Sequence, residues 1–357
     1  MTQQTRRPTI ADVATAAGVS KTSVSFAFNT PERLRPETLT RIRHSAATLG
    51  YRPKAAPRTL GQRRHGTIAI LAPHELGAMF ANPYFGEFAA GALAASEAAG
   101  FAVQFLSPLH GPIGHATHGS GIAGVLAVGL RTDGPEIEDI HGSGLPLVTV
   151  DSAPASGIPG VTVDDEAGAH AAAEHLLDLG HRSFLIVSMG PFPSAAGNPW
   201  TVRARRMAGY SGALAAHGIV LSDESVVYAH ASVEGGAGAF AHAWACGQRP
   251  SAVIAMSDAM AIGVIRAARE LGLHVPTDLS VVGFDDIEMA RYIDPPLTTV
   301  RQHIHDKGRE AVRLLLSSPA RREDRRDSQI ELETRLVIRG STRRVRASRG
   351  AGSRREP

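Results

Sequence analysis

The sequence predicts an α/β protein with two parts: an N-terminal three-helix domain and a two-lobed body with parallel sheets. Three observations support this fold class. In the first fifty residues, apolar side chains recur at helical spacing, and a glycine separates the first two groups of them. From Thr67 the chain alternates short apolar runs with helical stretches, and this alternation is repeated in a second, similar half. A hydrophobic fraction of 43% over 357 residues is enough for more than one core.

The N-terminal residues 1–50 have the spacing of three short helices. The apolar positions of the first two recur at helical intervals: Val13, Ala14, Ala17, Val24 and Ala27. Gly18 stands where the first helix must turn sharply, because glycine takes positive φ without steric cost, and Ser20 is a suitable cap for the second helix. The third helix begins at Pro36 and is ended by Gly50, and its apolar positions, which we expect to be buried, are Leu39, Ile42, Ala46 and Leu49. The first two helices therefore form a helix-turn-helix, whose exposed face offers donors for phosphates and base edges.

Charge is distributed unevenly along the chain. Residues 1–65 contain twelve lysines and arginines against three acidic residues, and residues 341–357 contain six arginines against one glutamate. The stretch between them is acidic, since the whole chain has a formal net charge of only +3. A polyanion would therefore meet the N-terminal domain, which predicts double-stranded DNA as its partner. The arginine-rich residues 341–357 are predicted to be a basic disordered tail.

From Thr67 onward the pattern predicts buried strands of parallel sheets separated by helices. The predicted strands are 68–71, 103–106, 125–128, 147–150, 184–188, 253–256 and 280–284. The predicted helices are 84–99, 167–179, a stretch around 240–245, and 259–271. Two similar halves predict two lobes with a cleft between them, which is a common place for a small ligand.

Other features limit the class of protein. Cys246 is the only cysteine, so no intramolecular disulfide can form, and its small and apolar neighbours predict that it is buried. No signal peptide is recognisable in residues 1–7, and no stretch approaches the roughly 20 apolar residues that span a bilayer. We therefore expect a cytoplasmic protein with no membrane partner.

Two local patterns do not lead to a site. The glycines from Gly119 to Gly124 spell a dinucleotide-binding pattern, but they precede a strand, whereas that fingerprint must follow a strand and open a helix. Three histidines (His110, His115 and His118) lie in a Gly/Pro-rich stretch without acidic or cysteine partners, which favours a solvated loop over a metal site. We expect no metal, no cofactor and no catalytic residue.

Several motifs are similar to those of a known family. In the N-terminal part they are Thr9 to Ala14, Ala17 to Ser20, Val24-Ser25, Asn29 and Leu49 to Pro53, and in the body they are Val163 to Gly168, Arg206 with Gly209-Tyr210, Pro276 to Asp286 and Pro295 to Val300. With these motifs the chain resembles the LacI/GalR family of bacterial transcriptional regulators over nearly its whole length. The resemblance implies a helix-turn-helix DNA-binding domain (1–50), a hinge helix or linker (51–65), and a periplasmic-binding-protein-like body (66–340) that binds an effector and forms a homodimer.

The resemblance also assigns DNA contacts. The resemblance places these contacts at the start of the second helix of the helix-turn-helix (the recognition helix), at residues that position this helix on phosphates, and at the entry to the hinge. The residues are Thr9, Ser20, Lys21, Thr22, Ser23, Phe26, Asn29, Arg33, Arg35, Thr38, Tyr51 and Lys54. Leu60 matches the leucine that the family inserts into the minor groove. Two residues depart from the family pattern. Phe26 stands where an arginine is most common, so its readout must be apolar contact, for example with a thymine methyl. Pro57 lies in the hinge, in a first helical turn where a missing N–H is tolerated.

In the body, the resemblance implies a sugar or nucleoside-like effector bound between the lobes. Arg206 matches the ligand-contacting arginine, whose planar fork can hold two oxygens, and Asp285 can accept hydrogen bonds from hydroxyls. The further candidates are strand-end polar residues and aromatic rings that could stack: Tyr84, Phe85, Asp151, Ser257 and Asp258. Near the position where many sugar-binding members offer an aromatic ring this chain has Ser232, so stacking from that side is not expected.

These observations predict a sequence-specific DNA-binding transcriptional regulator, with a repressor released by its effector as the leading interpretation. An activator, or a co-repressor-type regulator of the same family, is the alternative within that class. A stand-alone metabolite-binding protein is disfavoured by the basic N-terminal domain. An enzyme is disfavoured because no nucleophile, metal or cofactor motif supports one.

Overall fold

The computed structural model describes residues 9–29, 33–49, 51, 66–72, 76–106, 121–190, 201–317 and 328–345. The chain divides into two compact units, residues 1–57 and 58–357. The predicted contacts Lys54 and Leu60, Pro57 and the three histidines of the Gly/Pro-rich stretch lie outside the described residues.

The first unit contains the three predicted helices, α1 (Ile10–Ala17), α2 (Lys21–Asn29) and α3 (Pro36–Leu49). Gly18 has φ +61° and closes α1, and the Ser20 hydroxyl accepts the backbone N–H of Ser23 at 3.1 Å, as the sequence predicts. All five predicted apolar positions of α1 and α2 are buried together with Ile42 and Ala46 of α3. The packing of α1 against α2 and α3 therefore depends on small and β-branched side chains. The polar residues Lys21 and Thr22 of α2 are exposed at the surface.

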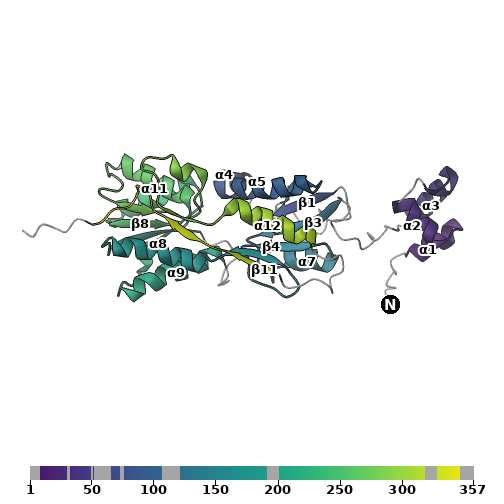
Figure 1. Cartoon of the computed structure of the whole chain (residues 1–357), viewed down its shortest axis with the longest axis horizontal. Coiled ribbons are helices and arrows are strands. Elements are labelled where there is room, and N and C mark those ends of the chain that lie inside the picture. The colour runs from purple at the N-terminus through teal and green to yellow at the C-terminus, as the bar shows by residue number, and fades with distance from the viewer. Residues whose placement is uncertain are drawn as a thin grey trace, which may run out of the picture. The chain divides into compact units, whose positions relative to one another are not determined.

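The second unit contains two lobes, whose elements Figure 1 labels. Lobe 1 is built on a six-stranded parallel sheet in the order β11-β5-β4-β3-β1-β2. Its strands are β1 (Thr67–Leu71), β2 (Ala102–Leu106), β3 (Ile122–Val128), β4 (Leu147–Val150), β5 (Gly160–Val163) and β11 (Gln329–Leu332). Its helices are α4 (Leu76–Ala81), α5 (Pro83–Ala98), α7 (Pro135–Ser143) and α12 (Ile304–Ser317). Alternate strand residues pack against α5 and α12 on one face and against α7 on the other.

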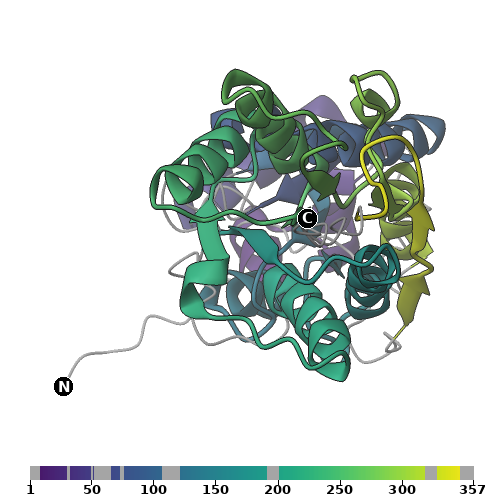
Figure 2. The same ribbon diagram turned by 90° about the vertical axis from the view of Figure 1, so that its left-hand side faces the viewer.

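Lobe 2 has a four-stranded parallel sheet in the order β7-β6-β8-β9. Its strands are β6 (Phe184–Met189), β7 (Val226–Ala229), β8 (Ala252–Ala255) and β9 (Ser280–Val282), and β10 (Thr299–Arg301) pairs antiparallel with β12 (Arg335–Val337). Its helices are α8 (Asp165–Asp178), α9 (Val202–Ala216), α10 (Val233–Ala245) and α11 (Asp258–Glu270), with short 3-10 turns η5 (Asp223–Ser225) and η6 (Glu288–Arg291). Helices α8 and α9 cover one face and α10 and α11 the other, and Figure 2 shows this layering end-on.

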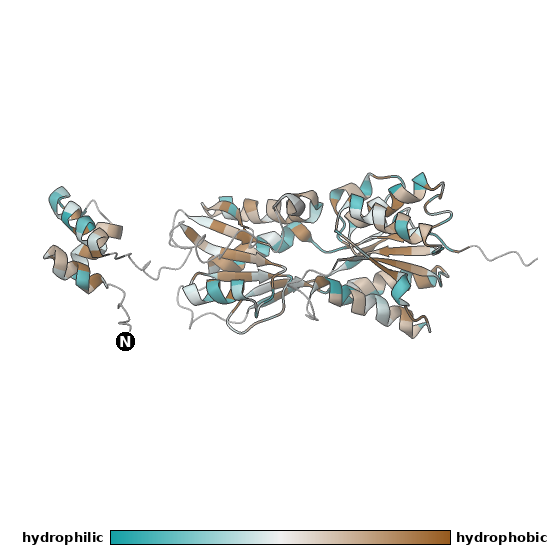
Figure 3. Cartoon of the chain, turned by 180° about the vertical axis from the view of Figure 1, so that it is seen from behind, coloured by the Kyte–Doolittle hydropathy of each residue, from teal (hydrophilic) through white to brown (hydrophobic). Residues whose placement is uncertain are grey.

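Apolar strands lie inside both lobes, between helices whose outer faces are polar (Figure 3). Each lobe also contains a helix pair that packs closely through glycine. A Cβ on Gly91 of α5 would collide with the His305 carbonyl of α12, and a Cβ on Gly263 of α11 would collide with the Val233 carbonyl of α10. These glycines allow the backbones to approach, so that the helices bring their ends to defined places at the edge of each sheet.

Three chain segments connect the two lobes: β5 to α8, β10 to α12, and β11 to β12. Each lobe is therefore assembled from stretches that are distant in the sequence. The connections at residues 164, 302–303 and 333–334 are short, so residues within them lie near both lobes.

The structure corrects four expectations. Residues 103–106 were expected to be a buried strand, but β2 is at the edge of its sheet and is partly exposed. Cys246 is exposed rather than buried, because it follows the last residue of α10 on the outer side. Leu49, at the end of α3, is 39% exposed.

None of the described helices is long and apolar enough to cross a membrane.

The fourth correction concerns the expected tail at 341–357, because residues 341–345 pack on lobe 2. The Ser341 side chain is fully buried, donates to the Val281 carbonyl at 2.6 Å and accepts the Thr298 N–H at 2.8 Å. The Val345 N–H donates to the Leu179 carbonyl at 2.9 Å. Composition alone indicates a solvated segment here, since it does not reveal these backbone pairings. Residues 346–357 lie outside the described part of the chain.

Candidate functional site

A cavity of about 440 Å³ opens between the lobes of the second unit. It lies at the carboxyl ends of both parallel sheets, where Asp151 follows β4, Ser257 follows β8 and Asp285 follows β9. Ligands of open parallel sheets bind at this end of the strands. Six residues that the sequence predicts as effector contacts line this one cavity. They are Tyr84, Phe85, Asp151, Arg206, Ser257 and Asp285.

Four helices begin at the cavity, and each is capped by a side chain that lines it. Asn82 accepts the Tyr84 N–H at the start of α5 (3.1 Å), and Thr201 accepts the Ala204 N–H at the start of α9 (3.1 Å). Ser232 and Ser257 do the same for Gly235 in α10 (3.0 Å) and Met260 in α11 (3.3 Å). The positive ends of four helix dipoles therefore surround the space.

The lobe 2 wall carries an ion-pair network around Arg206, which is 4% exposed. Its Nε donates to Asp165 at 2.8 Å, and its Nη1 donates to the Met256 carbonyl and lies 3.5 Å from Asp285. Arg205 donates to the other oxygen of Asp165. Burial alone would lower the pKa of Arg206, but Asp165 and Asp285 raise it overall. The guanidinium also lies over the Phe284 ring, 3.5 Å from its centroid, so its plane is fixed.

Asp285 is held in an uncommon backbone conformation, with φ +129°. A residue other than glycine is strained in that region, and such strain is most often found at functional sites. Its side chain accepts from Gln302 Nε2 through Oδ1 and is 4% exposed. Burial raises the pKa of Asp285 to about 6, although Arg206 and the Gln302 hydrogen bond act in the opposite direction.

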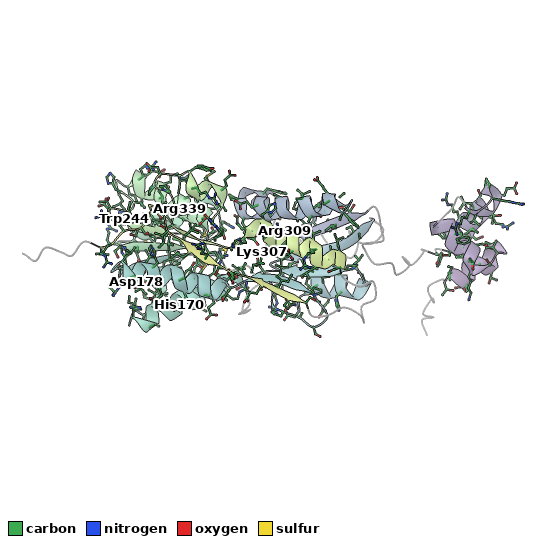
Figure 4. The ribbon with its side chains drawn as sticks, viewed as in Figure 1. His170, Asp178, Trp244, Lys307, Arg309 and Arg339 are labelled. Atoms are coloured by element: carbon green, nitrogen blue, oxygen red, sulfur yellow. The ribbon has the colours of Figure 1, made fainter. Side chains whose placement is uncertain are left out.

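The lobe 1 wall contains a second buried pair that the sequence did not predict. Lys307 of α12 is fully buried, and its Nζ lies 2.9 Å from both oxygens of Asp151. The same ammonium donates to Gln302 Oε1 at 2.7 Å and to the Tyr84 hydroxyl at 3.3 Å, while Tyr84 donates to Asp151 at 2.6 Å. Burial acts to raise the pKa of Asp151, but the charge of Lys307 and hydrogen bonds lower it overall. Figure 4 labels Lys307 near the start of α12.

A pattern in the sequence could have revealed Lys307. The buried stripe of α12 contains Ile304, Gly308, Ala311 and Leu315, and Lys307 stands inside that stripe. A charged residue in an apolar stripe needs a buried partner of opposite charge. Gln302, which was also not predicted, joins the two walls because it bonds both Asp285 and Lys307.

The structure corrects the prediction for Asp258, which does not line the cavity. Its carboxylate is fully buried, accepts the Ile287 N–H at 3.0 Å and accepts the Thr299 hydroxyl. It therefore has a packing role within lobe 2. Burial raises its pKa well above the usual value, and Asp285 adds to the shift. Ser257 does line the cavity, but its hydroxyl is already used as the α11 cap. The described residues contain no group of three or more metal-ligating side chains.

The first unit presents the predicted DNA-contacting side chains of α2 at its surface. Ser20, Lys21 and Thr22 are exposed, and Ser23 and Phe26 are partly exposed. Arg33 and Arg35 are exposed in the stretch before α3, and Thr38 and Tyr51 are partly buried. The Arg33 guanidinium lies 5.5 Å from the centroid of the Phe26 ring. Thr9 is the N-cap residue of α1, and its N–H and its hydroxyl both donate to Asp12 Oδ2 at 2.7 Å. The backbone of Asn29 ends α2.

Two family models match the chain. The model for bacterial regulatory proteins of the lacI family matches residues 9–54, and the model for a periplasmic binding protein-like domain matches residues 173–342. Among curated proteins, the chain is 31% identical over 348 residues to the HTH-type transcriptional regulator CelR of Thermobifida fusca, covering 95% of this chain and 99% of the relative. It is 29% identical over 347 residues to the HTH-type transcriptional repressor CytR of Escherichia coli strain K12, covering 96% and 98%. Among solved structures, a transcriptional regulator CelR-cellobiose complex matches with a TM-score of 0.69 and 29% identity, covering 94% of this chain and 100% of that one.

Proposed function

Because this chain belongs to the LacI family of bacterial regulatory proteins and is a DNA-binding transcriptional regulator, we propose that it is an effector-controlled repressor. In this proposal, a homodimer binds an operator in bacterial cytoplasm through α2, and a sugar or nucleoside-like effector in the lobe cavity weakens that binding. The similar solved structure is a complex of the transcriptional regulator CelR with cellobiose, and this supports an effector of the sugar class.

The observation that carries the proposal is that both lobes contribute polar residues to the cavity wall. Asp151 and Tyr84 come from lobe 1, Arg206 and Asp285 come from lobe 2, and Gln302 connects them through a segment between lobes. A ligand that contacts both walls has a different affinity when the lobes move relative to each other. A differential affinity of this kind is what an effector needs in order to shift a conformational equilibrium.

For the DNA side, we propose that Lys21, Thr22 and Ser23 at the start of α2 face base edges or flanking phosphates. Their exposure and their place at the helix start support this, since the first residues of a recognition helix commonly contact bases. Further backbone contacts are proposed for Thr9, Ser20, Asn29, Arg33, Arg35, Thr38 and Tyr51, and for Lys54 and Leu60 in the hinge.

The proposal can be tested in two steps on the full chain. Selection from a random duplex pool should yield a pseudo-palindromic site, and Lys21→Ala should weaken binding to it. A thermal-shift screen of sugars and nucleosides should then find a ligand that raises the unfolding midpoint, since a ligand that binds the native state stabilises it. That ligand should release the selected duplex. If the ligand instead tightens duplex binding, the protein is a co-repressor-type regulator, and if no duplex is selected, the DNA-binding assignment fails.

A further inference from the structure

Three carboxylates and three cations around the cavity form ion pairs with one another. Asp151 pairs with Lys307 at 2.9 Å. Asp165 pairs with Arg205 and Arg206, and Asp285 lies 3.5 Å from Arg206. Three carboxylates thus face three cations, and each of these charged groups has a partner of opposite charge within 4 Å.

Arg203 is a further cation that this network does not include. It lines the cavity from the first turn of α9 and is partly exposed to it. Within the described part of the chain, no carboxylate lies within 4 Å of its guanidinium, whereas Arg205 and Arg206 on the same helix both bind Asp165. Arg203 therefore lines the cavity without a carboxylate partner among the described residues.

The starts of α5, α9, α10 and α11 add their positive dipole ends to the same space. A neutral ligand would leave the guanidinium uncompensated in a confined space, where charges interact more strongly than in bulk water.

We infer that the effector is an anionic sugar derivative whose carboxylate or phosphate is bound by Arg203. This inference rests on the proposed effector function and names the ligand class for that site. The planar guanidinium can hold two oxygens of either group at once. Asp285 also lines the cavity, where its carboxylate can accept hydrogen bonds from hydroxyl groups of the same molecule.

The first test uses inorganic phosphate as the probe and the unfolding midpoint of the full chain as the readout, at constant ionic strength. Wild-type protein should be stabilised by phosphate, Arg203→Gln should bind it at least about tenfold more weakly, and Arg203→Lys should fall between them. Arg203→Met serves as a second neutral variant if Arg203→Gln folds poorly. The matched control is Arg249→Gln, an exposed arginine that lies over Trp244 away from the cavity, and it should respond like wild type.

An equal phosphate response in wild type and both neutral Arg203 variants overturns the inference, and so does no response in wild type.

The second test separates the two anion sources and the proposed function. Matched sets of a neutral sugar, its uronic acid and its phosphate ester are compared in wild type and Arg203→Gln. A preference for the uronate or for the phosphate ester that Arg203→Gln abolishes supports the inference and names the source. Binding of only the neutral members overturns the inference while leaving an effector site in place. If the anion binds through Arg203 but never changes affinity for the selected duplex, the ligand class stands and the regulatory proposal fails.

Discussion

Asp285 combines three unusual properties in one residue: a positive φ, nearly complete burial and a pKa raised to about 6. Each property costs stability in the absence of a ligand. The backbone conformation is strained, and burial disfavours the charged carboxylate. The Arg206 and Gln302 contacts offset only part of that cost. A residue kept in this state is suited to accept hydrogen bonds from a ligand, since the ligand removes part of the penalty.

The raised pKa of Asp285 predicts a pH effect on stability. The unfolded chain has an aspartate pKa near 3.9, so between about pH 4 and pH 6 the native state binds more protons at this residue and its stability contribution falls as the pH rises. Relative to wild type, Asp285→Asn should therefore gain up to about 3 kcal/mol in unfolding free energy between pH 4 and pH 7. Urea unfolding across that range measures the difference.

The control for this prediction is Asp223→Asn, because Asp223 is an exposed carboxylate of η5. Comparing the two variants separates the effect of a buried carboxylate from that of losing a carboxylate exposed to solvent. A difference between Asp285→Asn and wild type that stays constant with pH would show that Asp285 does not titrate near pH 6.

The Lys307–Asp151 pair predicts a large effect from removing one partner. Lys307→Met leaves the buried Asp151 without its ammonium, which should destabilise the protein by about 3–5 kcal/mol in urea unfolding. Combining it with Asp151→Asn removes the uncompensated charge and should restore part of that loss. A double variant that is less stable than Lys307→Met would contradict the assignment of the cost to a buried charge.

Sequence reasoning located some of the cavity residues and missed others for a physical reason. Arg206 and Asp285 stand in motifs that resemble a known family, so their positions could be predicted. Lys307 belongs to no such motif, and its role depends on Asp151, a residue distant in sequence that meets it only in the folded chain. Asp258 was misassigned because a carboxylate at a strand end can face either the cavity or the neighbouring chain segments. Here it accepts hydrogen bonds from the Ile287 N–H and the Thr299 hydroxyl.

At the scale of elements, α2 carries the clearest departure from the family pattern. Phe26 is partly exposed on this helix, and the Arg33 guanidinium lies above its ring. Phe26→Arg should change the preferred duplex, because an arginine can donate to guanine whereas a phenyl ring cannot. Selection from a random duplex pool measures the change. The control is Arg43→Gln on the exposed face of α3, and an unchanged profile for Phe26→Arg would show that this side chain does not face the bases.

The buried strands of the body and the helices α5, α8, α10 and α11 were predictable, whereas the short strands and the other helices were not. Apolar runs marked β1, β4, β6, β8 and β9 within one or two residues, and they marked β3 with a start three residues late. The strands β5, β7, β10, β11 and β12 were missed, since each has only three or four residues and most are half exposed. The helices α4, α7, α9 and α12 were also missed. The sequence of α12 is rich in charge, and its apolar stripe includes Lys307.

At the scale of the second unit, the two lobes touch through a contact outside the cavity. Glu87 on α5 of lobe 1 accepts the Glu288 N–H of η6 in lobe 2 at 2.9 Å. Burial raises the pKa of Glu87, although the hydrogen bond from Glu288 acts to lower it. The contact exists only when the lobes are arranged as they are here, so it favours that arrangement over others.

Removing this contact should weaken any ligand that bridges the two lobes. A hydrogen bond to a charged acceptor contributes about 1.5–3 kcal/mol at most, and partial exposure reduces it, so Glu87→Ala should lower ligand affinity by about three- to tenfold through the population of the present arrangement. Calorimetry with a ligand found in the thermal-shift screen measures the affinity. Glu87→Gln keeps an acceptor oxygen at the same place and should stay within about twofold of wild type. Equal losses in the alanine and glutamine variants would mean that the charge of Glu87, rather than its hydrogen bond to the other lobe, affects the ligand.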